Sequence, residues 1–164
     1  MRIIGIDPGL SGGIAVLEDS KIKEIFDMPV MSDGKKNKRQ LNSALLAQLV
    51  KDNLRDSGDT VIIVEQVNAM PGQGVTSMFN FGQSFGAIKG ICAALGLPIF
   101  FVRPAKWKKH FELINSSKDA SRTKVIEMYP SIAEKLSKKK DVNKSDAILI
   151  ALYYSQTRFK KDSN

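Results

Sequence analysis

The chain has 164 residues, of which 43% are hydrophobic, and its 25 Lys and Arg residues outnumber 17 Asp and Glu residues for a formal net charge of +8. This length is typical of one domain with a sizeable core. The single cysteine, Cys92, excludes an intrachain disulfide or cysteine-based zinc site, and the single histidine, His110, argues against histidine-rich metal sites. No apolar run approaches the roughly 20 residues of a membrane span, so we expect a cytoplasmic protein without a membrane partner.

The positive charge is concentrated in short segments. A basic surface can simply keep a protein in solution, which is one interpretation of this charge. Clusters of this kind are also typical of nucleic-acid-binding domains, and we favour that interpretation. The clusters are Lys35 to Arg39, Arg103 to Lys109, Lys118 to Lys124, Lys138 to Lys140 and Arg158 to Lys161.

The first thirteen residues organise the rest of the chain. A short run rich in β-branched residues ends at Asp7, and Pro8-Gly9 follows, which predicts a buried strand and then a tight turn. Because Asp7 would share its strand face with apolar or glycine positions, its carboxylate needs a partner. That partner is either the backbone amides of the turn or a metal ion.

Two more strands, over 14–17 and 21–28, complete an antiparallel meander. The polar and basic segment 31–39 is expected to be a loop. A stripe of Leu and Val with a period of 3.6 residues predicts a helix between 42 and 58, with Asn at its N-cap. The β-branched run Thr60–Glu65 predicts a central strand buried on both faces, and it also ends with an acid.

After a loop over 66–74, a long helix is expected over 77–95. Gly82, Gly86 and Gly90 fall four residues apart on one side of it. Glycine costs a helix interior roughly 1 kcal/mol, so this register predicts close packing against that side. Whether the packing partner lies in the same chain or in a second chain stays open.

The C-terminal half alternates short elements. Together with the meander, this alternation predicts an α/β fold with a mixed sheet and helices on both faces. We expect one domain over 1–157 and a basic tail over 158–164. The expected elements are a strand over 97–102, a short helix around Trp107, a helix over 119–128, helical turns over 130–136, a charged loop over 138–143 and a last helix over 145–156.

Three acids fall at the ends of predicted elements. Asp7 and Glu65 end strands that can pair in parallel, and Asp146 lies in the first turn of the last helix, with Asp141 and Asn143 as further oxygen donors nearby. Clustered carboxylates without His or Cys favour Mg²⁺ or Mn²⁺. Two such ions about 4 Å apart can activate water and stabilise the leaving oxygen in phosphodiester cleavage. The alternative is that each acid caps a turn or a helix.

These blocks resemble the RuvC-type Holliday-junction resolvases of the RNase H-like superfamily. The resemblance rests on Ile-Gly-Ile-Asp7-Pro-Gly, the strand that ends at Glu65, and Ser145-Asp146-Ala147. It covers about residues 1–157 and implies an RNase H-like five-stranded sheet, a three-strand antiparallel meander plus two parallel strands, with helices on both faces. Similarity to the phage-type branch is carried by 68–74, 79–86 and 103–109.

The resemblance implies a homodimer that binds a four-way DNA junction and nicks two opposed strands with Mg²⁺, for which Mn²⁺ can substitute, with two ions per site. By position, Asp7, Glu65 and Asp146 match the metal-binding carboxylates of the family. The family commonly has a fourth acid one helical turn before the last, where this chain has Asn143. We expect Asp141 to be the fourth ligand, with Asn143 as the alternative.

The resemblance also suggests which residues touch DNA. Lys108 matches a basic position that the family places near the scissile phosphate, although a solvated helix face is the simpler interpretation. Trp107 is interpreted as a core residue rather than a stacking platform. The other DNA-binding candidates are Lys106 and Lys109, Lys118 and Arg122 near the second basic position of the family, and Met70 and Phe79, which either enter the junction centre or pack.

Three functions remain in competition. The first is an Mg²⁺-dependent nuclease that resolves Holliday junctions. The second is an RNase H-like nuclease that acts on other branched DNA or on RNA–DNA hybrids. The third is a junction-binding protein with a weakened metal site, which the neutral Asn143 suggests.

Overall fold

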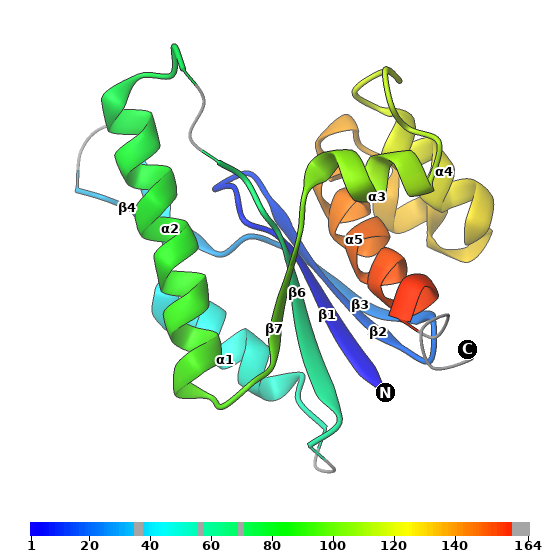
Figure 1. Ribbon diagram of the computed structural model, residues 1–164, viewed down its shortest axis with the longest axis horizontal. Coiled ribbons are helices and arrows are strands. Elements are labelled where there is room, and N and C mark those ends of the chain that lie inside the picture. The colour runs from blue at the N-terminus through cyan, green and yellow to red at the C-terminus, as the bar shows by residue number, and fades with distance from the viewer. Residues whose placement is uncertain (35–37, 56–57, 69–70, 159–164) are drawn as a thin grey trace.

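A five-stranded sheet forms the centre of the computed structural model, which describes residues 1–34, 38–55, 58–68 and 71–158 (Figure 1). The strand order is β3-β2-β1-β6-β7. β2 is antiparallel to β1 and β3, whereas β6 is parallel to β1 and β7, so the predicted mixed sheet is confirmed. The bounds are β1 (Arg2–Asp7), β2 (Gly13–Glu18), β3 (Lys21–Asp27), β6 (Thr60–Glu65) and β7 (Ile99–Val102).

Helices cover both faces of this sheet, as expected. In Figure 1, α1 and α2 lie on one side of the strands and α3, α4 and α5 on the other. Among the described residues, no helix has the length and apolarity to cross a membrane. The bounds are α1 (Ser43–Asp52), α2 (Val75–Ala94), α3 (Pro104–His110), α4 (Ala120–Met128) and α5 (Val142–Arg158), with 3₁₀ segments η1 (Pro130–Leu136) and η2 (Lys139–Asp141) between α4 and α5.

The alternation of side chains along β1 builds two hydrophobic cores. Ile3 packs in the core that contains α5, whereas Ile4 and Ile6 pack in the core with α1 and α2. Gly5 faces α5, and a Cβ at this position would lie only 2.8 Å from the Cβ of Ala151. A glycine is therefore required for α5 to approach β1, and this approach brings the start of α5 to the carboxyl end of the strand.

Two predicted loops are partly wrong. In the segment 31–39, residues 31, 32 and 39 belong to two paired antiparallel strands, β4 (Val30–Ser32) and β5 (Arg39–Leu41), whereas 33, 34 and 38 lie outside strands as predicted and 35–37 are outside the described residues. Leu41 of β5 is buried, and the polar residues stay exposed. The expected charged loop over 138–143 is η2 followed by the start of α5. The Asp141 carboxylate accepts the Lys138 N–H at 2.8 Å and caps η2, which leads directly into α5, so that helix begins three residues earlier than predicted.

Candidate active site

Asp7 is the last residue of β1, and the turn after it folds back tightly. The Gly9 N–H donates to Asp7 Oδ1 at 3.4 Å, and the Gly12 N–H donates to the Gly9 carbonyl at 2.7 Å. A Cβ at Gly12 would collide with the Asp7 carbonyl group, so a side chain there is excluded. The predicted turn bond to the carboxylate therefore exists, but at 3.4 Å it is long and leaves the group available to another partner.

Glu65 reaches the same edge of the sheet from the neighbouring strand. β1 and β6 are parallel, and the last paired residues are Ile6 and Val64. Asp7 and Glu65 each follow this pair by one residue, so they end neighbouring strands at the same edge of the sheet. Its Oε1 accepts a 2.8 Å hydrogen bond from Nε1 of Trp107. Trp107 is fully buried, as the sequence predicted, and its indole N–H orients the Glu65 side chain.

Asp146 comes from α5, which packs across β1 and β2. Its carboxylate interacts with the hydroxyl of Ser121 on α4, a residue that is itself buried. Ser121 was not among the predicted site residues. A small residue on the buried side of a helix is as typical of helix packing as of an active site, so the sequence alone did not identify Ser121.

The ionisation of the three acids shows that they share one environment. Burial, followed by the charges of Glu65 and Asp146, raises the pKa of Asp7 from 3.8 to about 7. Burial and the charge of Glu65 likewise raise the pKa of Asp146 from 3.8 to about 6, although the Ser121 hydroxyl and Lys108 lower it. Burial also raises the pKa of Glu65. The fold thus brings the three predicted acids together, in surroundings that disfavour their negative charge.

Lys108 is the cation that faces this cluster. It is half-buried on α3, and its charge lowers the pKa of each of the three acids. Its Nζ also lies 5.3 Å from the centroid of the Trp107 ring, within range of a cation–π contact. Beside it a cavity of about 220 Å³ opens, whose polar lining includes Lys108, Ser116, Ser117, Lys118, Ser121, Asn143 and Asp146.

Comparison with known families agrees with this geometry. The model of the family described as "Crossover junction endodeoxyribonuclease RuvC" matches residues 3–154, nearly the whole chain. The chain belongs to the RuvC family. The prediction of a nuclease of this type is therefore confirmed. No curated protein sequence matches the chain.

Solved structures show the same fold in distant relatives. A T. thermophilus RuvC in complex with a Holliday junction substrate has a TM-score of 0.57 at 16% identity, covering 96% of this chain and 97% of that one. A second T. thermophilus RuvC structure has a TM-score of 0.53 at 19% identity, covering 95% and 96%. The fowlpox virus Holliday junction resolvase has a TM-score of 0.56 at 19% identity, covering 96% and 99%.

The two candidates for a fourth RuvC-family ligand both have other partners. Asp141 is buried, and its carboxylate accepts the Lys138 N–H and pairs with Lys144 Nζ at 2.9 Å. Burial alone would raise the pKa of Asp141, but these contacts lower it below its usual value. The side-chain amide of Asn143 donates to the carbonyl oxygen of Ser11 in the turn after Asp7.

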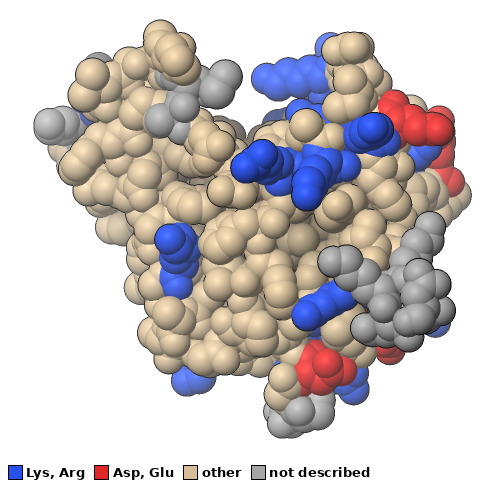
Figure 2. All heavy atoms as spheres, viewed as in Figure 1, with Lys and Arg blue, Asp and Glu red and all other residues tan. Residues whose placement is uncertain are grey.

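The predicted DNA-binding residues are spread over two sides of a hollow. Figure 2 shows Lys and Arg side chains gathered over α3 and its neighbourhood, across a hollow from the N-terminal end of α2. Arg122 instead forms an ion pair with Asp119 at 2.6 Å and donates to the Leu136 carbonyl at 3.0 Å, which fits a structural role. Lys106, Lys109 and Lys118 are exposed, Phe79 is exposed on α2, and Met70 lies outside the described residues.

The donor set suits a hard divalent cation. Burial raises the pKa of all three carboxylates, and the charge of Glu65 adds to the rise at Asp7 and Asp146, so a cation would stabilise their ionised forms; oxygen ligands are those that Mg²⁺ and Mn²⁺ prefer. As the side chains stand, no group of three or more Asp, Glu, His or Cys residues in the described part of the chain is spaced to hold a metal ion. Side-chain rotation would therefore have to accompany binding.

Proposed function

We propose that this RuvC-family protein is a metal-dependent endonuclease that binds four-way DNA junctions as a homodimer and resolves them by paired, symmetric nicks. The observation that carries the proposal is the meeting of Asp7, Glu65 and Asp146 at one end of the sheet, with Lys108 facing all three. A relative with the same fold has been solved with a Holliday junction substrate, which supports a junction as the ligand.

In the proposed reaction the protein holds ions and orients phosphate. Asp7, Glu65 and Asp146 would hold Mg²⁺, two ions per site with Mn²⁺ as a substitute, and the bound metal supplies water activation and stabilisation of the leaving oxygen. Trp107 keeps the Glu65 carboxylate oriented through its N–H. Lys108 attracts the scissile phosphate toward the acids and balances part of its charge.

The cavity beside Asp146 offers a path for the DNA backbone. Serine hydroxyls and lysine ammonium groups are common phosphate donors, and Ser116, Ser117 and Lys118 line this cavity together with Lys108. The exposed Lys106 and Lys109 on α3 would extend the positive surface along the bound strand.

The open side of α2 supports the homodimer. Among the described residues, and apart from the neighbouring backbone of α2 itself, no heavy atom lies within 4 Å of where a Cβ would stand at Gly82, Gly86 or Gly90. The close packing that these glycines predict is therefore not supplied by the described part of this chain. Val75 and Phe79, which are 86% and 64% exposed, continue the same side of the helix. A second copy packed there would bury this side, and Phe79 would then lie at the dimer contact or beside the junction centre.

A nuclease assay with four labelled substrates tests the proposal. The purified protein is incubated with a four-way junction, a flap, a linear duplex and an RNA–DNA hybrid, each with Mg²⁺ and with EDTA. We expect paired nicks at symmetric positions of the junction, in Mg²⁺ only. Cleavage of the hybrid or the flap in preference to the junction would instead identify an RNase H-like nuclease with another substrate.

A junction-binding protein with weak catalysis is the second candidate. It is favoured by the contacts of Asp141 and Asn143, because neither residue is free to complete a four-ligand site. In the same assay, this candidate predicts a shift of the junction in a native gel without metal-dependent cutting. Paired nicks in Mg²⁺ would exclude it.

A further inference from the structure

We propose that Asn143 is a positioning residue rather than a metal ligand. Its side-chain amide fastens the turn after Asp7 to the start of α5, and so it sets the separation of the Asp7 and Asp146 carboxylates. This inference rests on the proposed function insofar as those carboxylates bind metal. The contact itself, however, can be tested in the protein without metal or DNA.

The first observation is the hydrogen bond between Asn143 and the turn. The acceptor is the carbonyl oxygen of Ser11, which cannot donate, so the nitrogen of the Asn143 amide must face it. Ser11 lies in the loop between Asp7 and β2, whereas Asn143 lies three residues before Asp146 on α5. One side chain therefore links the two segments that carry the two acids.

The backbones meet at the same point. A Cβ at Gly13 would lie 2.8 Å from the carbonyl oxygen of Asn143 and 2.9 Å from the Cα of Lys144, so the start of β2 rests directly on the start of α5. Glycine is needed for this approach because any side chain would force the two backbones apart. The Asn143 amide closes the contact next to this glycine.

The start of α5 is also held by ion pairs of Lys144, the residue after Asn143. Lys144 Nζ lies 2.9 Å from Asp141 Oδ1 and 3.6 Å from Asp27 Oδ1, which belongs to β3. The second oxygen of Asp141 accepts the Lys138 N–H at 2.8 Å. Both oxygens of Asp141 thus hold the start of α5 in place, and three carboxylates remain for metal.

The other hydrogen bonds of the turn, among the described residues, lie within it or tie it to neighbouring segments other than α5. The Gly12 N–H donates to the Gly9 carbonyl at 2.7 Å and the Gly12 carbonyl accepts the Met28 N–H at 3.0 Å, whereas the side-chain contacts at Asp7 Oδ1 and Ser11 Oγ are long, at 3.4 Å and 3.5 Å. Removing the Asn143 amide would therefore release the turn from the start of α5, and the Asp7 carboxylate would be less firmly positioned relative to Asp146. A ligand that is not held by its neighbours binds metal more weakly.

The test compares three variants. Asn143→Ala removes the amide, and Asn143→Asp replaces the donor with a carboxylate that would repel the Ser11 carbonyl. The matched control is Asn53→Ala, because Asn53 Nδ2 donates a comparable 2.9 Å bond to the Leu49 carbonyl in α1, at the opposite end of the sheet. For each folded protein, free Mn²⁺ is followed by electron paramagnetic resonance during titration, and amide hydrogen exchange at 9–13 is measured in EDTA.

We expect both Asn143 variants to bind Mn²⁺ about tenfold more weakly than the wild type and to exchange faster at 9–13, while Asn53→Ala changes neither. Tighter Mn²⁺ binding by Asn143→Asp would show that this position is a ligand and would overturn the proposal. Unchanged Mn²⁺ affinity in both variants would show that the bond is merely structural and would overturn it as well. If the wild type itself bound no Mn²⁺, the proposed function would fail, whereas the exchange data would still report on the bond.

Discussion

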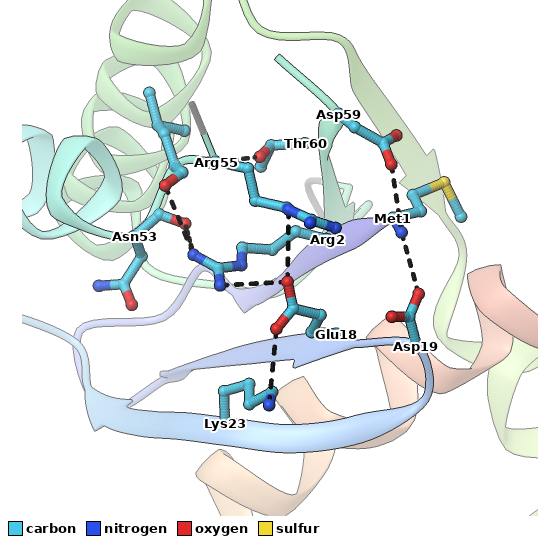
Figure 3. Close-up of polar contacts among 10 residues, drawn as sticks. Met1, Arg2, Glu18, Asp19, Lys23, Asn53, Arg55, Asp59 and Thr60 are labelled. Atoms are coloured by element: carbon cyan, nitrogen blue, oxygen red, sulfur yellow. Dashed lines mark hydrogen bonds and ion pairs between the residues drawn. The ribbon is translucent and has the colours of Figure 1, made fainter. Parts of the chain in front are cut away.

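The two ends of the central sheet place carboxylates in opposite electrostatic environments. At the carboxyl end of β1, Asp7 meets two further acids and the facing cation Lys108. At the other end, Glu18 of β2 lies 3.3 Å from Arg2, 3.4 Å from Arg55 and 3.5 Å from Lys23 (Figure 3). The same kind of group is thus surrounded by like charge in one place and by opposite charge in the other.

The pKa values record this difference. Burial and neighbouring acids raise the pKa of Asp7 to about 7. Desolvation also acts to raise the pKa of Glu18, but the charges of Arg2, Arg55 and Lys23 outweigh it and the pKa is lowered. The Glu18 cluster therefore favours the folded chain, whereas the Asp7 cluster opposes it until a cation arrives. Such uncompensated charge is typical of functional sites.

The largest expected effect comes from removing one acid at the functional end. Asp7→Asn should lower junction cleavage in Mg²⁺ by about a thousandfold or more, because a metal ligand is lost. Junction binding should survive or strengthen, since a negative charge near the phosphates disappears. Cleavage rates and native-gel binding measured on the same junction test both parts. Loss of binding together with cleavage would contradict the assignment of Asp7 to the metal site.

The next effect comes from the cation that faces the acids. Lys108→Ala should slow cleavage by roughly 10- to 100-fold, since a charge near the scissile phosphate is lost. Lys51→Ala is the control, because Lys51 is an exposed lysine on α1 that is not among the residues proposed to contact DNA. Single-turnover rates at saturating enzyme separate this effect from weaker binding. Equal rates for the two variants would place Lys108 on an ordinary solvated surface.

The contrast between the two ends also marks what sequence can predict. Asp7 and Glu65 were predictable because each ends a β-branched run, and parallel strands place such ends together. The roles of Asp141 and Asn143 were not, since a capping carboxylate and a ligand have the same composition and differ only in which atoms they meet in three dimensions. The paired strands β4 and β5 were not predicted, because they are short and mostly polar and give no alternating hydrophobic pattern. Leu41 is the residue of this pair that is buried in the core.

A third prediction uses the pH dependence of the metal-free protein. Folded Asp7 and Asp146, with pKa values of about 7 and about 6, keep protons that the unfolded chain releases near pH 4. Unfolding therefore releases protons between pH 4 and pH 7, and the stability in EDTA should fall by several kcal/mol in total as pH rises through that range. Urea unfolding at pH 5 and pH 8 measures it, and Mg²⁺ should restore stability at pH 8 more than at pH 5.

Asp7→Asn isolates this contribution from other titrating groups. The variant should lose less stability than the wild type between pH 5 and pH 8 in EDTA, and Mg²⁺ should stabilise it less. If the wild type and the variant had parallel pH profiles, the carboxylates would not carry the uncompensated charge that distinguishes this end of the sheet.

The smallest effect is expected at the compensated end. Glu18→Gln should lower the melting temperature by a few degrees and leave junction cleavage unchanged, because its three cations lie far from the acids along the strands.

The pH dependence of the Glu18 contribution is opposite in sign to that of Asp7. Because the folded pKa of Glu18 is lowered from 4.5, its stabilisation is present above pH 4.5 and is lost as pH falls through the lower folded value. The melting temperatures of variant and wild type should therefore converge in acid and in high salt, which screens such pairs. A difference that persisted in acid would mean that Glu18 acts through packing rather than charge.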